Sequence, residues 1–259
     1  MKFLIIIIFL FSTNGFCWTI NNSARMGFSN SDITIKIGSD TCSNANLTPA
    51  SLEAIVKEAI DDYWNKAPTS SLKLVTAGNS GISLSGNDLT AAAAKADANS
   101  ILIGCNQNAT LFSSNSILGV GGIGCNNGIC RAAVLMNDIT GTNLASADHA
   151  TIVTALSHEI GHAIGLGHSS IQGSIMYYSL TAKSQKTLHQ DDIDGITYLY
   201  PNSKKISGLA GACGTISTNT KNKKDFLTSL SLGMAMILFL RVFIFACASK
   251  KKKLFAEIV

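Results

Sequence analysis

Charged residues are scarce: only 14% of the 259 residues are Asp, Glu, Lys or Arg, and 46% are apolar. This composition excludes an intrinsically disordered chain, because the apolar surface suffices for a packed core. Clustered Lys and Arg are missing from residues 18–203, which hold nine basic against 14 acidic residues. Nucleic acid is therefore not an expected partner, since phosphate contacts need clustered basic residues on the folded surface.

The net charge of +4 comes from the end of the chain, where residues 204–259 hold ten basic and two acidic residues. Residues 226–248 are mostly apolar and precede four consecutive lysines. A helix of this length is about 34 Å long, enough for the hydrocarbon core of a bilayer. We expect a transmembrane helix or a sorting-signal helix at 226–248, after a polar spacer at 204–225 and before a basic cytoplasmic tail at 249–259.

The beginning of the chain is typical of a secretory signal peptide. Lys2 is followed by nine apolar residues at 3–11 and then by small polar residues. The apolar run is too short to cross a bilayer, which takes about 20 residues; a buried first strand is the alternative. We expect residues 1–17 to be a signal peptide and residues 18–203 to be an exported domain, anchored to the membrane or cell surface.

A CxxC pair is absent, so a thiolate zinc cluster is not expected. Residues 18–203 contain four cysteines, an even number that suggests two disulfides in an oxidising compartment, with three possible connectivities. Residues 125–130 resemble a hairpin closed on itself. This favours a Cys125–Cys130 bond and leaves Cys42 with Cys105.

Hydrophobic patterns predict alternating strands and helices in residues 18–203. Residues 32–37 alternate polar and apolar side chains, as a strand does. Thr48 and Pro49 are typical of the start of a helix, which we expect to run to Lys66. Residues 119–124 are rich in glycine but lack the ending of a phosphate loop, and we expect a flexible turn there. We also predict strands at 72–76, 100–105 and 131–137 and helices at 89–98 and 147–166. The order indicates an α/β or α+β domain.

The helix at 147–166 carries the motif His158-Glu159-x-x-His162. Residues four apart share a helix face, so both imidazoles can bind one metal ion. Gly165 can adopt the left-handed conformation that ends a helix, which lets the chain return with His168 as a third ligand. Three imidazoles suit a catalytic Zn²⁺, which lowers the pKa of its bound water to about 7. Glu159 is then placed to accept the proton and pass it to the leaving amine.

Other interpretations of the motif exist. The histidines could cap or pack a helix, or the zinc site could have lost catalysis, which would make the chain an inactive surface binding or adhesion module. Zinc-activated water could also attack another amide, such as a peptidoglycan cross-link. The chain has five histidines, and the complete pattern at 158–168 uses three of them, which favours a zinc endopeptidase over these alternatives.

The pattern His-Glu-x-x-His-x-x-Gly-x-x-His at 158–168, followed by Ser169 and Met176, resembles the matrixins of the metzincin clan of zinc endopeptidases. Residues 54–68 and 188–201 resemble the first and last helices of that family. The resemblance implies a twisted mixed five-stranded sheet, a long active-site helix, a C-terminal helix and a zinc in a cleft. It also implies hydrolysis of protein or peptide substrates by metal-activated water.

The resemblance assigns further roles. Met176 would be the structural residue of a Met-turn beneath the metal. Asp191 and Asp192 would tie the last helix to that turn or to the mature N-terminus, or else would be solvated acids of the first turn that the helix dipole favours. Tyr178 would be an oxyanion donor or fifth ligand, or else a packing residue. Residues 131–137 would be the edge strand along which an extended substrate pairs, through Ala132, Ala133, Val134 and Leu135.

Some features of the family are not expected here. No cysteine motif precedes the domain, so latency through such a cysteine is doubtful. Only His149 precedes the catalytic helix, so we predict no second, structural zinc. Calcium is left open, although no Asp-rich loop of the right form is found. We expect a monomer, in which His149 and His189 are ordinary surface or capping residues.

Overall fold

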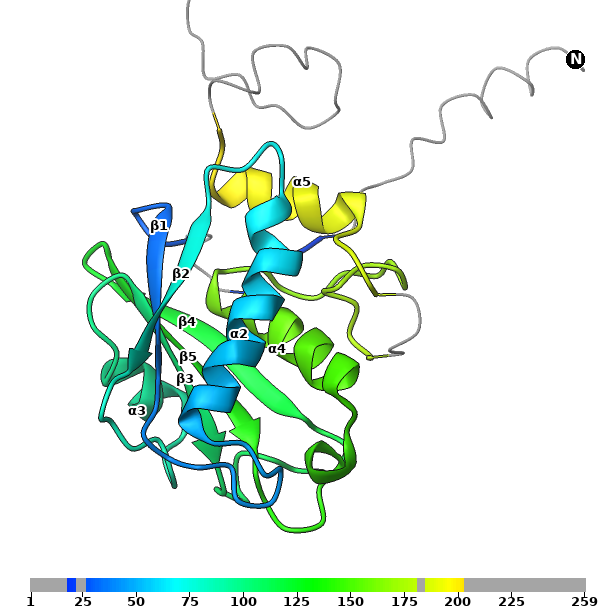
Figure 1. Ribbon diagram of the computed structural model, residues 1–259. Coiled ribbons are helices and arrows are strands. Elements are labelled where there is room, and N and C mark those ends of the chain that lie inside the picture. The colour runs from blue at the N-terminus through cyan, green and yellow to red at the C-terminus, as the bar shows by residue number, and fades with distance from the viewer. Residues whose placement is uncertain (1–17, 22–26, 181–184, 203–259) are drawn as a thin grey trace, which may run out of the picture. The chain divides into compact units, whose positions relative to one another are not determined.

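The computed structural model describes residues 18–21, 27–180 and 185–202 (Figure 1). The predicted signal peptide, spacer, apolar helix and basic tail lie outside these residues. No helix within the described ranges is long and apolar enough to cross a membrane.

A mixed sheet of five strands, in the order β2-β1-β3-β5-β4, forms the centre of the domain. The strands β1, β2, β3 and β5 pair in parallel, whereas β4 runs antiparallel to β5 and forms one edge. This confirms the predicted α/β class and the mixed five-stranded sheet. The strands are β1 (Asp32–Ile37), β2 (Lys73–Asn79), β3 (Ser100–Asn106), β4 (Gly119–Asn126) and β5 (Ile129–Asn137).

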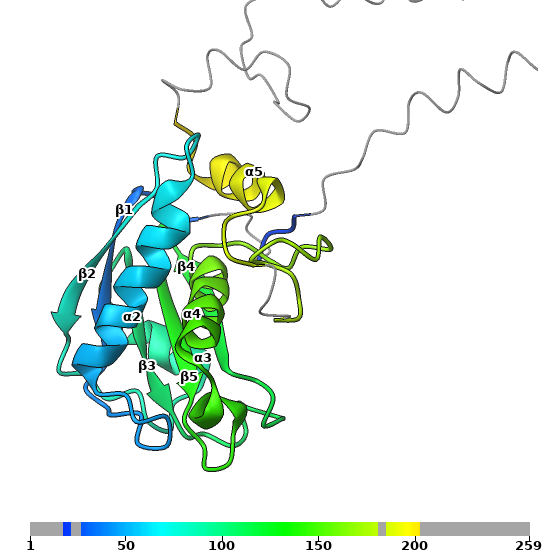
Figure 2. The ribbon, with the colours of Figure 1, turned by 45° about the vertical axis from the view of Figure 1, so that its right-hand side comes forward.

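Helices cover both faces of the sheet. The long helices α2 (Pro49–Asp62) and α4 (His149–Ala163) lie side by side on one face, and the short α3 (Leu89–Ala94) lies on the other (Figures 1 and 2). The helix α5 (Gln190–Leu199) lies near the end of the domain where α2 ends. The helix predicted up to Lys66 ends earlier and continues as a 3₁₀ turn at Trp64–Lys66.

The inner strands bury side chains on both faces. In β3, Ile101 and Ile103 belong to the core under α2 and α4, while Leu102 belongs to the core under α3. In β5, Val134 and Leu135 divide in the same way. A strand that is covered on both faces has a nearly continuous apolar sequence, which is why these two strands lack strict alternation.

Two predictions about the sheet edge are wrong. Residues 119–124 are not a turn but most of β4. Residues 131–137 are not the edge strand, because they lie between β3 and β4 and pair with both. The proposed substrate-pairing residues of β5 are each 0% exposed: Ala132, Ala133, Val134 and Leu135. The edge on this side of the sheet is formed by β4.

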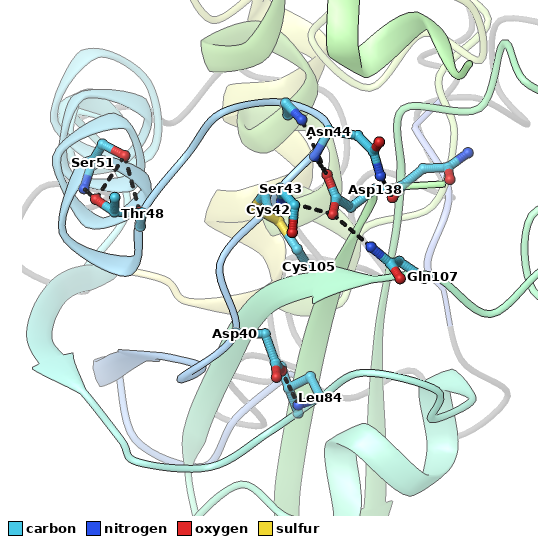
Figure 3. Close-up of a disulfide and its surroundings, with 12 residues drawn as sticks. Asp40, Cys42, Ser43, Asn44, Thr48, Ser51, Leu84, Cys105, Gln107 and Asp138 are labelled. Carbon is cyan, nitrogen blue, oxygen red and sulfur yellow. Dashed lines mark hydrogen bonds between the residues drawn. A yellow bond between two sulfur atoms is a disulfide. The ribbon is translucent and has the colours of Figure 1, made fainter. Parts of the chain in front are cut away.

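Both favoured disulfides are present. Cys125 and Cys130 face each other across the β4–β5 hairpin. Cys42 and Cys105 join the segment after β1 to the end of β3, over a sequence separation of 63 residues (Figure 3).

A buried carboxylate holds the same region beside the second disulfide (Figure 3). Asp138 accepts hydrogen bonds from the backbone N–H groups of Ser43 at 2.9 Å and Asn44 at 2.9 Å. The side-chain amide of Gln107 donates to the same carboxylate at 3.0 Å. These bonds connect the loop after β1 to the ends of β3 and β5.

Removal of the two disulfides should have unequal effects on stability. The chain entropy that a bond removes from the unfolded state grows with the closed loop, so a Cys42→Ala/Cys105→Ala variant should lose about 4 kcal/mol of unfolding free energy. A Cys125→Ala/Cys130→Ala variant, with its separation of five residues, should lose about 2 kcal/mol. Urea denaturation of the full chain measures both values, and equal losses would contradict the expectation.

Candidate metal centre

The helix α4 runs through the interior of the domain. The carboxylate of Asp148 caps its start by accepting a hydrogen bond from the N–H of Thr151 at 2.8 Å. Every residue of the helix from Ile152 to Ala163 is buried, including His158, Glu159 and His162. A surface helix would expose one face, so this burial takes the motif into the core.

The chain turns sharply where α4 ends. Gly165 has φ = 110°, a conformation that favours glycine, and the N–H of Leu166 donates to the carbonyl of Gly161 at 2.9 Å. The turn reverses the chain and brings His168 to the two histidines of the helix. The predicted use of Gly165 is confirmed.

The three histidines converge on one point. Their ring centroids are 4.8 Å apart for His158 and His162, 4.8 Å for His162 and His168, and 5.3 Å for His158 and His168. One nitrogen atom of each ring lies within 4.8 Å of the others. Within the described ranges, this is the one group of three or more His, Cys, Asp or Glu side chains that could hold a metal ion.

The hydrogen bonds of the buried histidines fit a metal-binding tautomer. Nδ1 of His158 lies 2.7 Å from the carbonyl oxygen of Ile175, and Nδ1 of His162 lies 2.8 Å from that of Leu166. Because a carbonyl oxygen only accepts, each Nδ1 carries the proton and each Nε2 keeps a free lone pair. Burial lowers the pKa of His158 to about 3 and that of His162 to about 4. Both rings are therefore neutral at neutral pH, as metal ligands must be, and three imidazoles match the donors that Zn²⁺ prefers.

Glu159 lies against the edge strand of the sheet. Burial raises the pKa of its carboxyl group to about 8, and a hydrogen bond with the backbone of Gly121 opposes this rise. A Cβ atom on Gly121 would lie 2.1 Å from the backbone oxygen of Glu159, so β4 approaches α4 more closely than a side chain would allow. The glycine at position 121 of β4 follows from this contact.

Met176 packs beneath the motif as an apolar residue. A Cβ atom on Gly161 would lie 2.2 Å from Met176 Sδ and 2.8 Å from the Trp64 ring, so this glycine makes room for both side chains. The N–H of Ser169 donates to the Met176 carbonyl at 2.8 Å, which connects the turn to the residue after His168.

Carboxylates at the start of α5 hold this region, as the resemblance implies. Asp192 accepts hydrogen bonds from the N–H groups of Ile175 at 2.9 Å and Met176 at 3.2 Å, and from the hydroxyl of Ser174. Asp191 accepts one from the Ser169 hydroxyl at 2.5 Å. Asp192 therefore ties α5 to the Met176 turn, the first of the alternatives.

Loss of the Asp192 carboxylate should destabilise this turn. An Asp192→Ala variant leaves several buried donors without an acceptor, and we expect a loss of about 2–3 kcal/mol in unfolding free energy. Asp194→Ala, on the same helix but partly exposed, should change it by less than about 0.5 kcal/mol. Urea denaturation compares the two, and equal effects would show that the buried hydrogen bonds add no stability.

The other singled-out residues lie apart from this cluster. Tyr178 is 67% exposed and packs against the Tyr177 ring, so its role toward oxyanion or metal stays a prediction. His149 Nε2 lies 2.8 Å from a Glu58 carboxylate oxygen. His189 caps α5. Both are surface or capping residues, as predicted.

Comparison with known proteins decides the family. Residues 61–201, more than half of the chain, match the family described as Matrixin. The chain belongs to the matrixin family. Its relatives include "Metalloendoproteinase 2-MMP" of Arabidopsis thaliana, which is 44% identical over 69 residues, or 26% of this chain and 17% of the relative.

Two further relatives show similar partial matches to this matrixin. "Metalloendoproteinase 1-MMP" of Arabidopsis thaliana is 33% identical over 114 residues, or 41% of this chain and 30% of the relative. "Interstitial collagenase" of Bos taurus is 48% identical over 74 residues, or 29% of this chain and 16% of the relative. The matched stretches thus cover less than a third of each of these three proteins.

Sequence reasoning missed two neighbours of this matrixin's metal centre. One is Gly121, which lies against the backbone of Glu159. The predicted Cys125–Cys130 hairpin required a strand before Cys125, and this signal could have placed Gly121 in a strand. The other is the short segment Trp18–Asn21, which lies beside the loop of His168 and carries no periodic signal.

Proposed function

We propose that this matrixin is a zinc-dependent endopeptidase that hydrolyses protein or peptide bonds. The observation that supports this most strongly is the convergence of His158, His162 and His168. The carboxylate of Glu159, the residue after His158, is buried on the same helix. The three histidines would hold the ion through Nε2 of the two buried rings and one nitrogen of the exposed ring.

The chemistry divides between the ion and the chain. Bound Zn²⁺ polarises a carbonyl group and makes water nucleophilic near neutral pH. In its ionised form, the Glu159 carboxylate would accept a proton from the attacking water and donate it to the amide nitrogen as the C–N bond breaks. A cation held by the three histidines would favour this form, against the effect of burial. Met176 has no part in proton transfer and supports the helix from below.

The free edge of β4 is the expected place for the substrate backbone. The N–H of Asn137 donates to the Leu118 carbonyl at 2.9 Å, which places Leu118 in a hydrogen-bonded pair at the end of the hairpin ladder. Pairs alternate along an antiparallel ladder, so Ile123 directs its N–H and C=O groups to the open edge, whereas the backbone of Gly121 is already hydrogen-bonded to Glu159. An extended peptide can pair there as an added strand.

A cavity beside this edge would receive substrate side chains. It has a volume of about 600 Å³ and lies between α3 and β4. Leu89 and Ala93 line one side, and Gly122 and Gly124 leave space on the other, where Arg131 adds a charged group. The apolar part of this lining favours apolar substrate side chains in the cavity.

We also propose that the domain is exported and tethered. The support comes from the sequence alone: the signal-like residues 1–17 and the apolar run at 226–248 followed by lysines. The exported compartment agrees with the two disulfides.

Metal removal tests the proposed activity. The full chain should contain one zinc per molecule and cleave a casein or peptide-library substrate, lose the cleavage after dialysis against a chelator, and regain it with added zinc. A chain that binds zinc and cleaves no peptide would instead be a binding module on an inactive scaffold. A folded chain that binds no zinc would contradict the metal site itself.

A further inference from the structure

The segment Trp18–Asn21 lies as a short strand beside the loop that carries the third histidine. Ile20 and Leu166 form an antiparallel bridge. The N–H of Gly167 donates to the Thr19 carbonyl at 2.8 Å, and the N–H of Asn21 donates to the Gly165 carbonyl at 2.9 Å. Two residues more than 140 positions away from the loop therefore share its backbone hydrogen bonds.

Two side chains of this strand reach the histidine residues directly. The Thr19 hydroxyl donates to the backbone carbonyl of His168 at 2.8 Å, and the Asn21 side-chain amide donates to that of His162 at 3.2 Å. The second contact adds to the hydrogen bond that this carbonyl of the last helical turn accepts from the N–H of Gly165 at 3.1 Å. The bond from Thr19 holds His168, which lies outside regular secondary structure.

We propose that Thr19 and Asn21 are positioning residues that hold His162 and His168 in the geometry of the metal site. This inference rests on the proposed zinc function and names residues that its motif does not contain. Three ligands bind an ion more tightly when they are held in place before it arrives. His158 and His162 are fixed by α4, but His168 comes from a turn, and the hydrogen bonds of Thr19 restrain that turn.

The strand is itself anchored and closely packed. The Trp18 ring packs against the Tyr198 ring of α5 with centroids 5.0 Å apart. A Cβ atom on Gly167 would lie 2.3 Å from Thr19 Oγ1, so the loop and the strand meet at a distance that needs glycine. The strand thus connects α5 to the loop of His168.

Removal of the Thr19 hydroxyl tests the inference through metal binding. We expect Thr19→Val in the full chain to raise the zinc dissociation constant by about three- to tenfold in a chelator competition. The ligand-field absorption of the Co²⁺-substituted protein should also shift. Thr19→Ser keeps the hydroxyl and should restore both values. Asn21→Ala should weaken zinc binding in the same direction.

The matched control is Thr110→Val, which removes a hydroxyl that donates to the Asn108 side chain in a loop apart from the histidines. It should leave zinc affinity and the cobalt spectrum unchanged. Thermal unfolding of each metal-free variant shows whether it is folded. A folded Thr19→Val variant with the parent affinity and spectrum would overturn the inference and leave the proposed function standing. If the parent chain binds no zinc, the proposed function fails and this inference fails with it.

Discussion

A Glu159→Gln variant of the full chain should lose peptide hydrolysis by about 10²–10⁴-fold in kcat/KM while it still binds one zinc per molecule. The amide keeps the shape of the side chain but cannot accept a proton. The ligand set does not include Glu159, because the convergent nitrogens belong to the three histidines. Cleavage of a fluorogenic peptide and metal analysis on the same preparation measure the two properties separately.

Glu58→Gln is the matched control for this variant. Glu58 is partly exposed and pairs with His149 on the surface, and exposed pairs of this kind contribute little to stability. Its kcat/KM should equal that of the parent chain. A Glu159→Gln variant with more than about a tenth of the parent activity would exclude Glu159 as the general base.

The metal motif could be predicted from the sequence because its geometry is local. The spacing of His158 and His162 places both rings on one helix face, whatever the rest of the fold does. Gly165 makes the turn that brings His168 back, and the glycine that allows this turn is a local signal too. The structure adds the Nδ1 hydrogen bonds, whose partner for His158 is Ile175, 17 residues away.

The edge strand of the sheet could not be predicted from the sequence, because the order of strands in a sheet depends on pairing between distant segments. Residues 119–124 contain four glycines, a composition more typical of turns than of strands. Gly121 among them is required by its close contact with α4, which local propensity does not include. Residues 131–137 have a continuous apolar sequence, which is typical of an inner strand. This pattern predicts their place in the sheet correctly, whereas the resemblance placed them at the edge.

The segment Trp18–Asn21 shows the same limit. It has four residues, too few for a periodic pattern, and its partners lie near residue 166. Only the folded chain brings it to the His168 loop.

Substitution of Gly121 should therefore damage both the fold and the site. In a Gly121→Ala variant the new Cβ would lie 2.1 Å from the backbone oxygen and 2.9 Å from the carbonyl carbon of Glu159. Backbone atoms of a buried helix cannot move aside as a flexible side chain can, so β4 must shift away from α4. We expect a loss of about 3 kcal/mol in unfolding free energy. A shift of about 1 Å at the substrate edge should also lower kcat/KM by about 100-fold.

Gly124→Ala on the same strand separates this contact from a general effect of losing glycine. A Cβ atom on Gly124 meets no atom within 4 Å, and neither glycine has a positive φ. The substitution should change the unfolding free energy by less than about 1 kcal/mol, in the stabilising direction, and should lower kcat/KM far less than Gly121→Ala does. Urea denaturation and peptide cleavage measure both variants. If Gly121→Ala behaves like Gly124→Ala, then β4 does not need its close approach to Glu159, and the glycine-rich edge has another cause.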